Sequence, residues 1–159
     1  MASPNFEEIK EQAEHAFTRA LRYLSFRARS EKEIFEYLSK KKHDPLIIQQ
    51  VIKRLKEKKF LDDTEFAKLW IEQRQMLKGK SKFVIKQELI AKGVAKEIID
   101  ESLEGFSQTD LTAAKNLFEK KKKRFSHYVG REYEKKVSEF LQRKGFSWDI
   151  VKKILQGKD

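Results

Sequence analysis

The sequence predicts an all-α protein made of three tandem three-helix units that form an elongated, curved array. Only 2 Pro and 6 Gly interrupt 159 residues that are otherwise rich in helix formers such as Lys, Glu, Leu and Ala. Apolar residues recur at i, i+1, i+4 and i+5, which is typical of the inner face of a short helix and not of a strand. A shared pattern also returns along the chain. The units are predicted to span residues 1–61, 62–106 and 107–159.

The repeat is clearest where the second helix of each unit is expected to end. Three leucines, 51 and then 52 residues apart, are each followed three positions later by a lysine. The next position is suited to a left-handed residue that ends a helix, a conformation that glycine adopts without a side-chain penalty. The matching residues are Leu38, Leu89 and Leu141, then Lys41, Lys92 and Lys144, then Lys42, Gly93 and Gly145.

The first unit is expected to begin with a long helix over residues 6–26. Ser30 and Glu33 form the capping-box pattern that opens a second helix. Asp44 then offers a cap, and Pro45 fits the first turn of a third helix.

The second unit repeats this order. Asp62 and Glu65 form another capping pattern before a long helix predicted over residues 64–78. Ser81 opens the next helix, and Gly105 stands where the last helix of the unit should end.

The third unit is expected to begin with a long helix over residues 109–124. Its second helix leads to the break at Gly145, and Ser147 opens the last helix, which ends near Gly157. Helices this short are marginal in water, so each unit must be stabilised by packing of its apolar faces.

The charge balance indicates an anionic partner. Lys and Arg number 36 against 25 Asp and Glu, which gives a formal net charge of +11. Such a field attracts nucleic acid or an acidic protein surface. The chain contains no Cys, no run of eighteen apolar residues and no basic-then-apolar leader at its N-terminus. We therefore expect a soluble, cytoplasmic monomer that binds no membrane.

Several ordered motifs resemble the RecX family of regulators of the RecA recombinase. The resemblance covers roughly Ala16 to Leu155, and its opening motif is the stretch from Ala20 to Glu33, followed by Leu38 and Lys41. Lys42 and Lys59 replace glycines that are common in the family, so the resemblance does not predict the turn geometry at these two positions. The remaining blocks are Phe60-Leu61-Asp62-Asp63, Phe66-Ala67 with Trp70, Lys78-Gly79, Glu88-Leu89 with Lys92-Gly93, and Phe140-Leu141 with Lys144-Gly145-Phe146.

The resemblance implies a role in DNA repair, homologous recombination and the SOS response. Members of the family bind in the groove of the RecA–DNA filament and lower its ATPase, strand-exchange and co-protease activities. The implied partner is therefore a RecA nucleoprotein filament, and single- and double-stranded DNA are further candidate partners.

Two dense groups of cations are the main candidate contact sites. One surrounds the end of the long helix of the second unit, and the other ends the long helix of the third, where cations also suit the helix dipole. Such contacts would neutralise phosphates or acidic side chains and carry no sequence code. The candidate contacts are Arg27, Arg29, Arg74, Lys78, Lys80, Lys82, Lys86, Lys120, Lys121, Lys122, Lys123, Arg124, Arg131, Arg143 and Lys144.

Other functions are less consistent with the sequence. The chain has no Walker A pattern, dinucleotide-binding glycine run or Gly-x-Ser-x-Gly elbow, so we expect neither catalysis nor a cofactor. Its three histidines lack metal-ligand spacing, and the adjacent Asp62 and Asp63 would point apart on a helix. A sequence-specific helical DNA-binding repressor remains the alternative.

Overall fold

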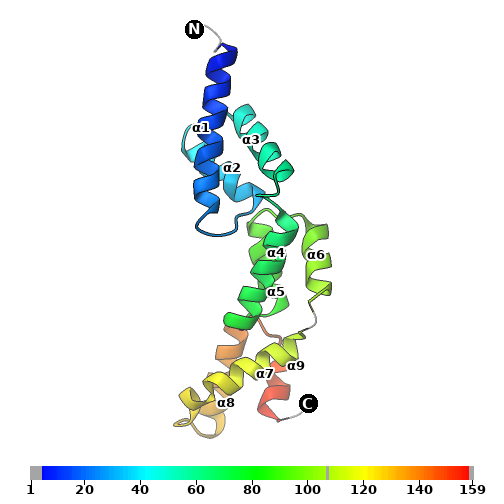
Figure 1. The fold of residues 1–159 in the computed structure, drawn as a ribbon. Helices are drawn as coiled ribbons and strands as arrows, with labels where there is room; N and C mark the ends of the chain where they lie inside the picture. Colours follow the sequence, from blue (N-terminus) through cyan, green and yellow to red (C-terminus); the bar gives the residue numbers. More distant parts are fainter. Residues whose placement is uncertain (1–4, 107, 158–159) are drawn as a thin grey trace. The chain divides into compact units, whose positions relative to one another are not determined.

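The structure, a computed structural model, describes residues 5–106 and 108–157 of the chain. Met1–Pro4, where no leader is expected, lie outside the described residues. Within those residues the chain forms nine α-helices, a π-helical turn and a 3-10 turn, without a strand (Figure 1). The predicted all-α class is confirmed. No helix in the described ranges has the length and apolar character needed to cross a membrane.

The helices follow one another in three groups. The first group is α1 (Phe6–Leu24), α2 (Glu31–Lys40) and α3 (Pro45–Glu57). The second is α4 (Asp63–Glu72), the π-helical turn η1 (Gln73–Leu77), α5 (Lys82–Ala91) and α6 (Lys96–Glu104). The third is α7 (Asp110–Lys121), the 3-10 turn η2 (Lys122–Phe125), α8 (Gly130–Arg143) and α9 (Trp148–Leu155).

Most of the predicted helix starts have the expected caps. Ser30 and Glu33 form the reciprocal capping box of α2. Asp44 accepts a hydrogen bond from the backbone N–H of Leu46, with Pro45 in the first turn of α3. Ser81 Oγ accepts from the N–H of Val84, whereas Ser147 precedes α9 without a side-chain cap. Short polar side chains thus satisfy N–H groups that the first turn leaves unpaired.

The chain divides into two compact bodies. The first body comprises the described residues up to Ala67 together with Ile90–Ile98, and the second comprises Lys68–Leu89 and the described residues from Ile99 onward. The helices α4, α5 and α6 contribute residues to both. In the first body α1, α2 and α3 pack around Ala16, Leu38 and Ile48, all fully buried.

The core of the second body is formed mainly by α7, α8 and α9. Ala114, Val137 and Leu141 are fully buried at its centre, and the rings of Phe125 and Phe140 lie 5.4 Å apart beside them. Burial of these side chains supplies the free energy that short isolated helices lack.

One type of contact between a helix start and a helix end is shared by the two bodies. In the first, Ser30 Oγ at the start of α2 donates to the carbonyl of Lys92, 2.7 Å away, after α5. In the second, the N–H of Ser81 before α5 donates to the carbonyl of Lys144, 3.0 Å away, after α8. The paired positions differ by 51 and 52 residues, so the contact repeats with the sequence pattern.

This contact explains where the repeat uses glycine. Gly93 and Gly145 follow the two accepting lysines and have φ values of 76° and 90°. A Cβ on Gly93 would overlap the side chain of Lys32, and one on Gly145 would overlap Val84 and Ser81. Lys42, at the equivalent position of the first group, also has a positive φ, 65°, but its side chain is exposed. The turn is therefore retained without glycine where the side chain reaches solvent.

Candidate functional site

The fold of the second body brings the two predicted cation groups together around Lys144. Lys78 and Lys80 come from the turn after η1, whereas Lys121 and Arg124 come from the end of α7 and from η2. All four act electrostatically on the ammonium group of Lys144, which caps the end of α8. We call Lys78, Lys80, Lys121, Arg124 and Lys144 the convergent basic cluster.

Among the residues of this cluster, Lys144 is the one whose positive charge is least favourable. Its side chain is half-buried, and burial together with repulsion from Lys80, Lys78, Lys121 and Arg124 lowers the pKa of its ammonium group. A bound anion would offset both the lost hydration and the repulsion. The surface around Lys144 therefore favours binding of a polyanion.

Most cations of the cluster have no acidic partner. Among the described residues, Lys78, Lys121, Arg124 and Lys144 form no ion pair, whereas Lys80 pairs with Glu88. Lys78 and Lys144 cap the C-terminal ends of η1 and α8, where the helix dipole favours positive charge. The helix dipole accounts for the positions of Lys78 and Lys144, but four further cations around one half-buried ammonium exceed what the helix ends need.

Arg74 of the candidate set, together with Lys80, is held by Glu88 of α5. The guanidinium Nε of Arg74 lies 3.0 Å from Glu88 Oε2, and the indole N–H of Trp70 donates to the same oxygen at 2.9 Å. The guanidinium also lies over the Trp70 ring, 4.2 Å from its centroid. Burial alone would raise the pKa of Glu88, but these donors and cations lower it. Arg74 thus contributes to the internal structure of the second body.

Lys82 and Lys86 also form internal contacts. Lys82 Nζ donates to the carbonyls of Leu103 and Phe106, at 3.2 and 3.1 Å, at the end of α6. Lys86 Nζ lies 2.5 Å from Asp100 Oδ1. These two lysines therefore hold α5 to the middle and the C-terminal end of α6 within the second body.

The remaining candidates of the second body lie at its surface. Lys122 pairs with Glu119 at 2.5 Å, and Arg143 Nε donates to the carbonyl of Glu139 at 3.2 Å. Each contact joins residues three or four positions apart at the end of a single helix, α7 in the first case and α8 in the second. Outside the convergent basic cluster, the exposed candidates of this body are Lys120, Lys122, Lys123, Arg131 and Arg143.

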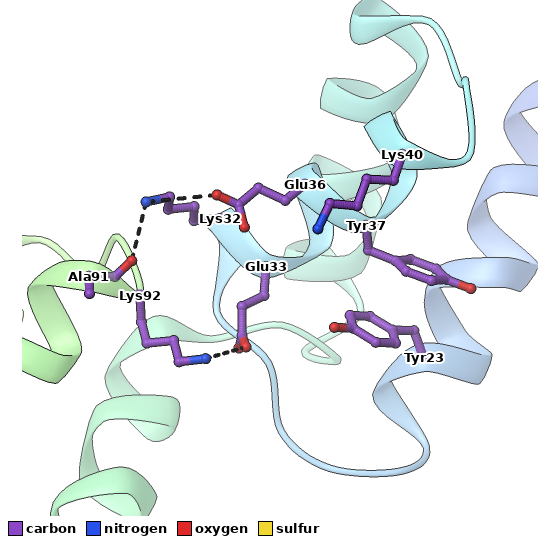
Figure 2. A pocket seen from close by; sticks show the side chains of 8 residues that line it. All are labelled: Tyr23, Lys32, Glu33, Glu36, Tyr37, Lys40, Ala91 and Lys92. Atoms are coloured by element: carbon purple, nitrogen blue, oxygen red, sulfur yellow. Dashed lines mark hydrogen bonds and ion pairs between the residues drawn. The ribbon is translucent and has the colours of Figure 1, made fainter.

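In the first body, Arg27 takes part in an ionic network centred on Glu33. Its guanidinium lies 2.6 Å from Glu33 Oε1, and the Lys92 ammonium lies 2.7 Å from the same oxygen. Figure 2 shows the Glu33 carboxylate directed toward Lys92, in a pocket of about 300 Å³. The backbone N–H of Ser30 donates to the other carboxylate oxygen at 3.1 Å. Arg27, Ser30 and Glu33 of the opening RecX-like motif thus form a structural network.

This network predicts a specific loss of stability in acid. Burial would raise the pKa of Glu33, but hydrogen bonds from Arg27, Lys92 and Ser30 lower it from 4.5 to about 2. Between pH 4.5 and about 2, the unfolded chain binds more protons at Glu33 than the folded chain does. The contribution of Glu33 to the free energy of unfolding is therefore complete above pH 4.5 and is lost as the pH falls toward 2. We expect Glu33→Gln to lower the free energy of unfolding at pH 7 by about 2–3 kcal/mol, as measured in urea.

Glu36→Gln is the matched control for that variant. Glu36 lies one turn further along α2, its side chain is 53% exposed, and its oxygen is 3.8 Å from Lys32 Nζ. An exposed pair of this kind contributes less than about 0.5 kcal/mol. Equal losses in the two variants would contradict the structural role of Glu33.

Arg29 closes an aromatic stack in the first body. The rings of Tyr23 and Tyr37 are stacked with centroids 4.0 Å apart, and Figure 2 shows them nearly parallel. The Arg29 guanidinium lies over Tyr23, 3.8 Å from its ring centroid. Lys41 lies 5.8 Å from the centroid of Tyr37. These contacts use the ring faces internally, so the stack resembles a packing feature more than a platform for a base.

The fold brings two of the three histidines together. The rings of His15 and His43 lie 5.7 Å apart in an edge contact, although they are distant in sequence. Burial, followed by the charges of Arg19 and His15, lowers the pKa of His43. In the described part of the chain no group of three potential metal ligands is found.

Gln75 is a buried polar residue that the sequence interpretation did not single out. It is 2% exposed, and within the described ranges neither atom of its amide has a hydrogen-bond partner. The signal was present in the sequence, because Gln75 lies four residues after Ile71, in line with the inward-facing stripe of α4. A polar residue at an apolar position of a helix can mark a site.

Three family models match the chain in order. They describe the first, second and third three-helix domains of RecX and match residues 16–55, 62–103 and 108–155. The predicted arrangement of three tandem three-helix units is thereby confirmed. The predicted domain boundaries and the elongated shape stay predictions.

Curated relatives and solved structures carry the same description. Regulatory protein RecX of a Geobacillus strain is 34% identical over 95% of this chain, and that of Bacillus subtilis is 38% identical over 89%. The matches cover 57% and 54% of those relatives, so the chain spans little more than half of their length. A crystal structure of RecX from Lactobacillus salivarius superimposes with a TM-score of 0.77 and 26% identity, covering 93% of this chain and 97% of that one.

Proposed function

This chain belongs to the RecX family of regulatory proteins, and from that premise we propose that it regulates a RecA recombinase by binding the groove of the RecA–DNA filament. The convergent basic cluster around Lys144 is the observation that carries this proposal. A filament on DNA presents phosphates and acidic protein groups, and such a partner would relieve the repulsion among these cations.

The proposed effect is a decrease in the ATPase, strand-exchange and co-protease activities of the recombinase. Tandem three-helix units offer several contact surfaces along one chain, so that one molecule can contact neighbouring subunits of a filament. Contacts with phosphates and acidic side chains fix the position of the protein on the filament without recognising the DNA base sequence. The protein would therefore act on filaments of any DNA sequence and itself perform no catalysis.

A titration of ATPase activity tests the proposal. The steady-state ATPase rate of the cognate recombinase on single-stranded DNA is measured while this protein is added below the recombinase concentration. We expect the rate to fall by half or more at such substoichiometric ratios, because one bound molecule affects several subunits. A constant rate, together with tight binding to one duplex sequence, would instead favour the DNA-binding repressor.

A further inference from the structure

Two large aromatic side chains of the second body are exposed at the starts of helices. Phe83, in the first turn of α5, is 65% exposed, and Trp148, the first residue of α9, is 54% exposed. Neither belongs to the buried core around Ala114 and Leu141. Single exposed apolar residues are ordinary on a protein surface, so the surroundings of these two rings decide whether they serve a partner.

The three-helix repeat does not require an aromatic ring at either position. When the three repeat leucines are aligned, both positions are occupied by other residue types in the remaining units. The corresponding residues are Lys32 and Lys135 for Phe83, and Pro45 and Lys96 for Trp148. All four are exposed. The helices therefore pack without a ring at these positions, and the two aromatic residues point to a role at the surface.

One contact brings both aromatic residues near the convergent basic cluster. The N–H of Ser81 donates to the carbonyl of Lys144, 3.0 Å away. Phe83 follows Ser81 by two residues, and Trp148 follows Lys144 by four. Because consecutive Cα atoms are about 3.8 Å apart, Phe83 Cα lies within about 8 Å of Ser81 Cα, and Trp148 Cα lies within about 15 Å of Lys144 Cα. Lys144 is the centre of the cluster, so both aromatic residues stand beside its cations.

Cations accompany each ring along the chain. Lys80 comes three residues before Phe83. Lys144 comes four residues before Trp148, and the exposed Lys152 follows it by four. Residues four apart lie on one face of a helix, so Trp148 and Lys152 share a face of α9. Exposed rings among cations are typical of surfaces that bind single-stranded nucleic acid, where bases stack on the rings and the cations neutralise phosphates.

We propose that Phe83 and Trp148 stack on unpaired bases of a single strand whose phosphates lie on the convergent basic cluster. Every base has a π-face, so such stacking requires no particular base sequence. The bases of a duplex are stacked on one another, so the rings favour single strands over duplex. The proposal deepens the proposed function, since it rests on nucleic acid being a partner and names the residues that contact the bases.

Strands with and without bases test the proposal. The full chain is titrated by fluorescence anisotropy against a labelled oligothymidylate and against a labelled abasic strand of the same length and charge. We expect about 100-fold tighter binding to the oligothymidylate, about tenfold for each of two stacked bases. Equal affinities for the two strands would overturn the proposal.

Leucine variants locate the base contacts. Trp148→Leu and Phe83→Leu each remove a flat ring and keep an apolar side chain, so each should weaken binding of oligothymidylate by about tenfold. The affinity for the abasic strand and the salt dependence should change less than twofold, because no phosphate contact is lost. Phe60→Leu is the matched control, since Phe60 of the first body is also 54% exposed, and it should bind both strands as the unaltered protein does.

The folding of the leucine variants is checked separately. Their urea midpoints should equal that of the unaltered protein, because the other units carry lysine or proline at these positions. A variant that binds both strands more weakly by the same factor would show a structural role for its ring, and would overturn the stacking assigned to that residue.

Tryptophan fluorescence gives a second readout. The chain has two tryptophans, and the indole N–H of Trp70 donates to Glu88 inside the second body. A stacked base quenches the emission of the indole. Oligothymidylate should therefore quench the fluorescence of the unaltered protein and of Trp70→Phe, but not that of Trp148→Leu. Quenching that persists in Trp148→Leu would assign the signal to Trp70 and contradict stacking on Trp148.

Failure of this proposal and failure of the proposed function give different results. Equal affinities for the two strands, with inhibition of the ATPase intact, overturn the base contacts and leave regulation of the recombinase standing. A preference for oligothymidylate without any effect on the ATPase supports the base contacts and overturns the proposed function. Quenching of Trp148 by polyglutamate, but not by oligothymidylate, would assign this surface to an acidic protein segment and overturn the base contacts.

Discussion

Replacement of Lys78, Lys121 and Lys144 together by glutamine should lower the affinity for a recombinase filament on single-stranded DNA by about 100-fold at 0.1 M salt. Each phosphate contact on a single strand contributes a slope of about 0.7 in log affinity against log salt. Three lost contacts reduce the slope by about 2, which is about two orders of magnitude at 0.1 M salt. Fluorescence anisotropy at several salt concentrations measures both affinity and slope.

This variant is expected to remain folded. Removing charge at Lys144 relieves the repulsion and lost hydration that lower the pKa of its ammonium group. The free energy of unfolding should therefore stay equal or rise slightly below pH 10.5, the ordinary value. Helical circular dichroism and urea unfolding check this point separately from binding.

The matched control removes the same charge elsewhere. Lys10, Lys53 and Lys58 are exposed residues of the first body, and their replacement by glutamine changes the net charge equally. If the convergent basic cluster is the contact surface, this control should lose less than about threefold, through weaker long-range steering alone. Equal losses in the two triple variants would mean that total charge, and not the cluster, determines binding.

Gly145→Ala should destabilise the second body by about 3 kcal/mol. The positive φ of 90° is unfavourable for a residue with a Cβ and costs about 1–2 kcal/mol. The added Cβ would also overlap Val84 Cγ2 and the buried Ser81 Oγ, and overpacking of this kind costs about 1–3 kcal/mol. Urea unfolding followed by circular dichroism measures the loss.

Gly157→Ala separates the two contributions. Gly157 follows α9 with a φ of 63°, but nothing lies within 4 Å of the position that its Cβ would occupy. Its replacement should cost about 1–2 kcal/mol, from backbone conformation alone. In a Val84→Ala background, the cost of Gly145→Ala should fall, because part of the overlap is removed. If both glycine variants lose the same amount in the presence of Val84, close packing at Gly145 is not important.

Local structure could be predicted where neighbouring residues determine it. The capping box of Ser30 and Glu33 connects groups only three residues apart, so its sequence pattern nearly determines its geometry. The repeat likewise located the glycine turns, and Lys42 adopts the same left-handed turn because its exposed side chain meets no neighbour. The long helix predicted over residues 64–78 was less accurate, since its last turn widens into η1.

The candidate site depended on contacts between distant residues. Sequence alone placed Arg74, Lys80, Lys82 and Lys86 in one basic group, but their partners, such as Glu88 and Asp100, are selected by the packing of α5 against its neighbours. Charge counting cannot distinguish a lysine that holds two helices together from one that is available to a partner. That distinction requires the tertiary structure.

The all-α class, the order of the three-helix units, most helix starts and the positive charge could be predicted from the sequence, because they follow from periodicity, short-range hydrogen bonding and composition. The convergence of Lys78 and Lys121 on Lys144, and the burial of Gln75 without a hydrogen-bond partner in the described part of the chain, could be seen only in the folded protein. Both features depend on burial and on distances between residues that are far apart in the chain. Such neighbours determine how strongly the charges repel one another and whether an amide loses its hydration.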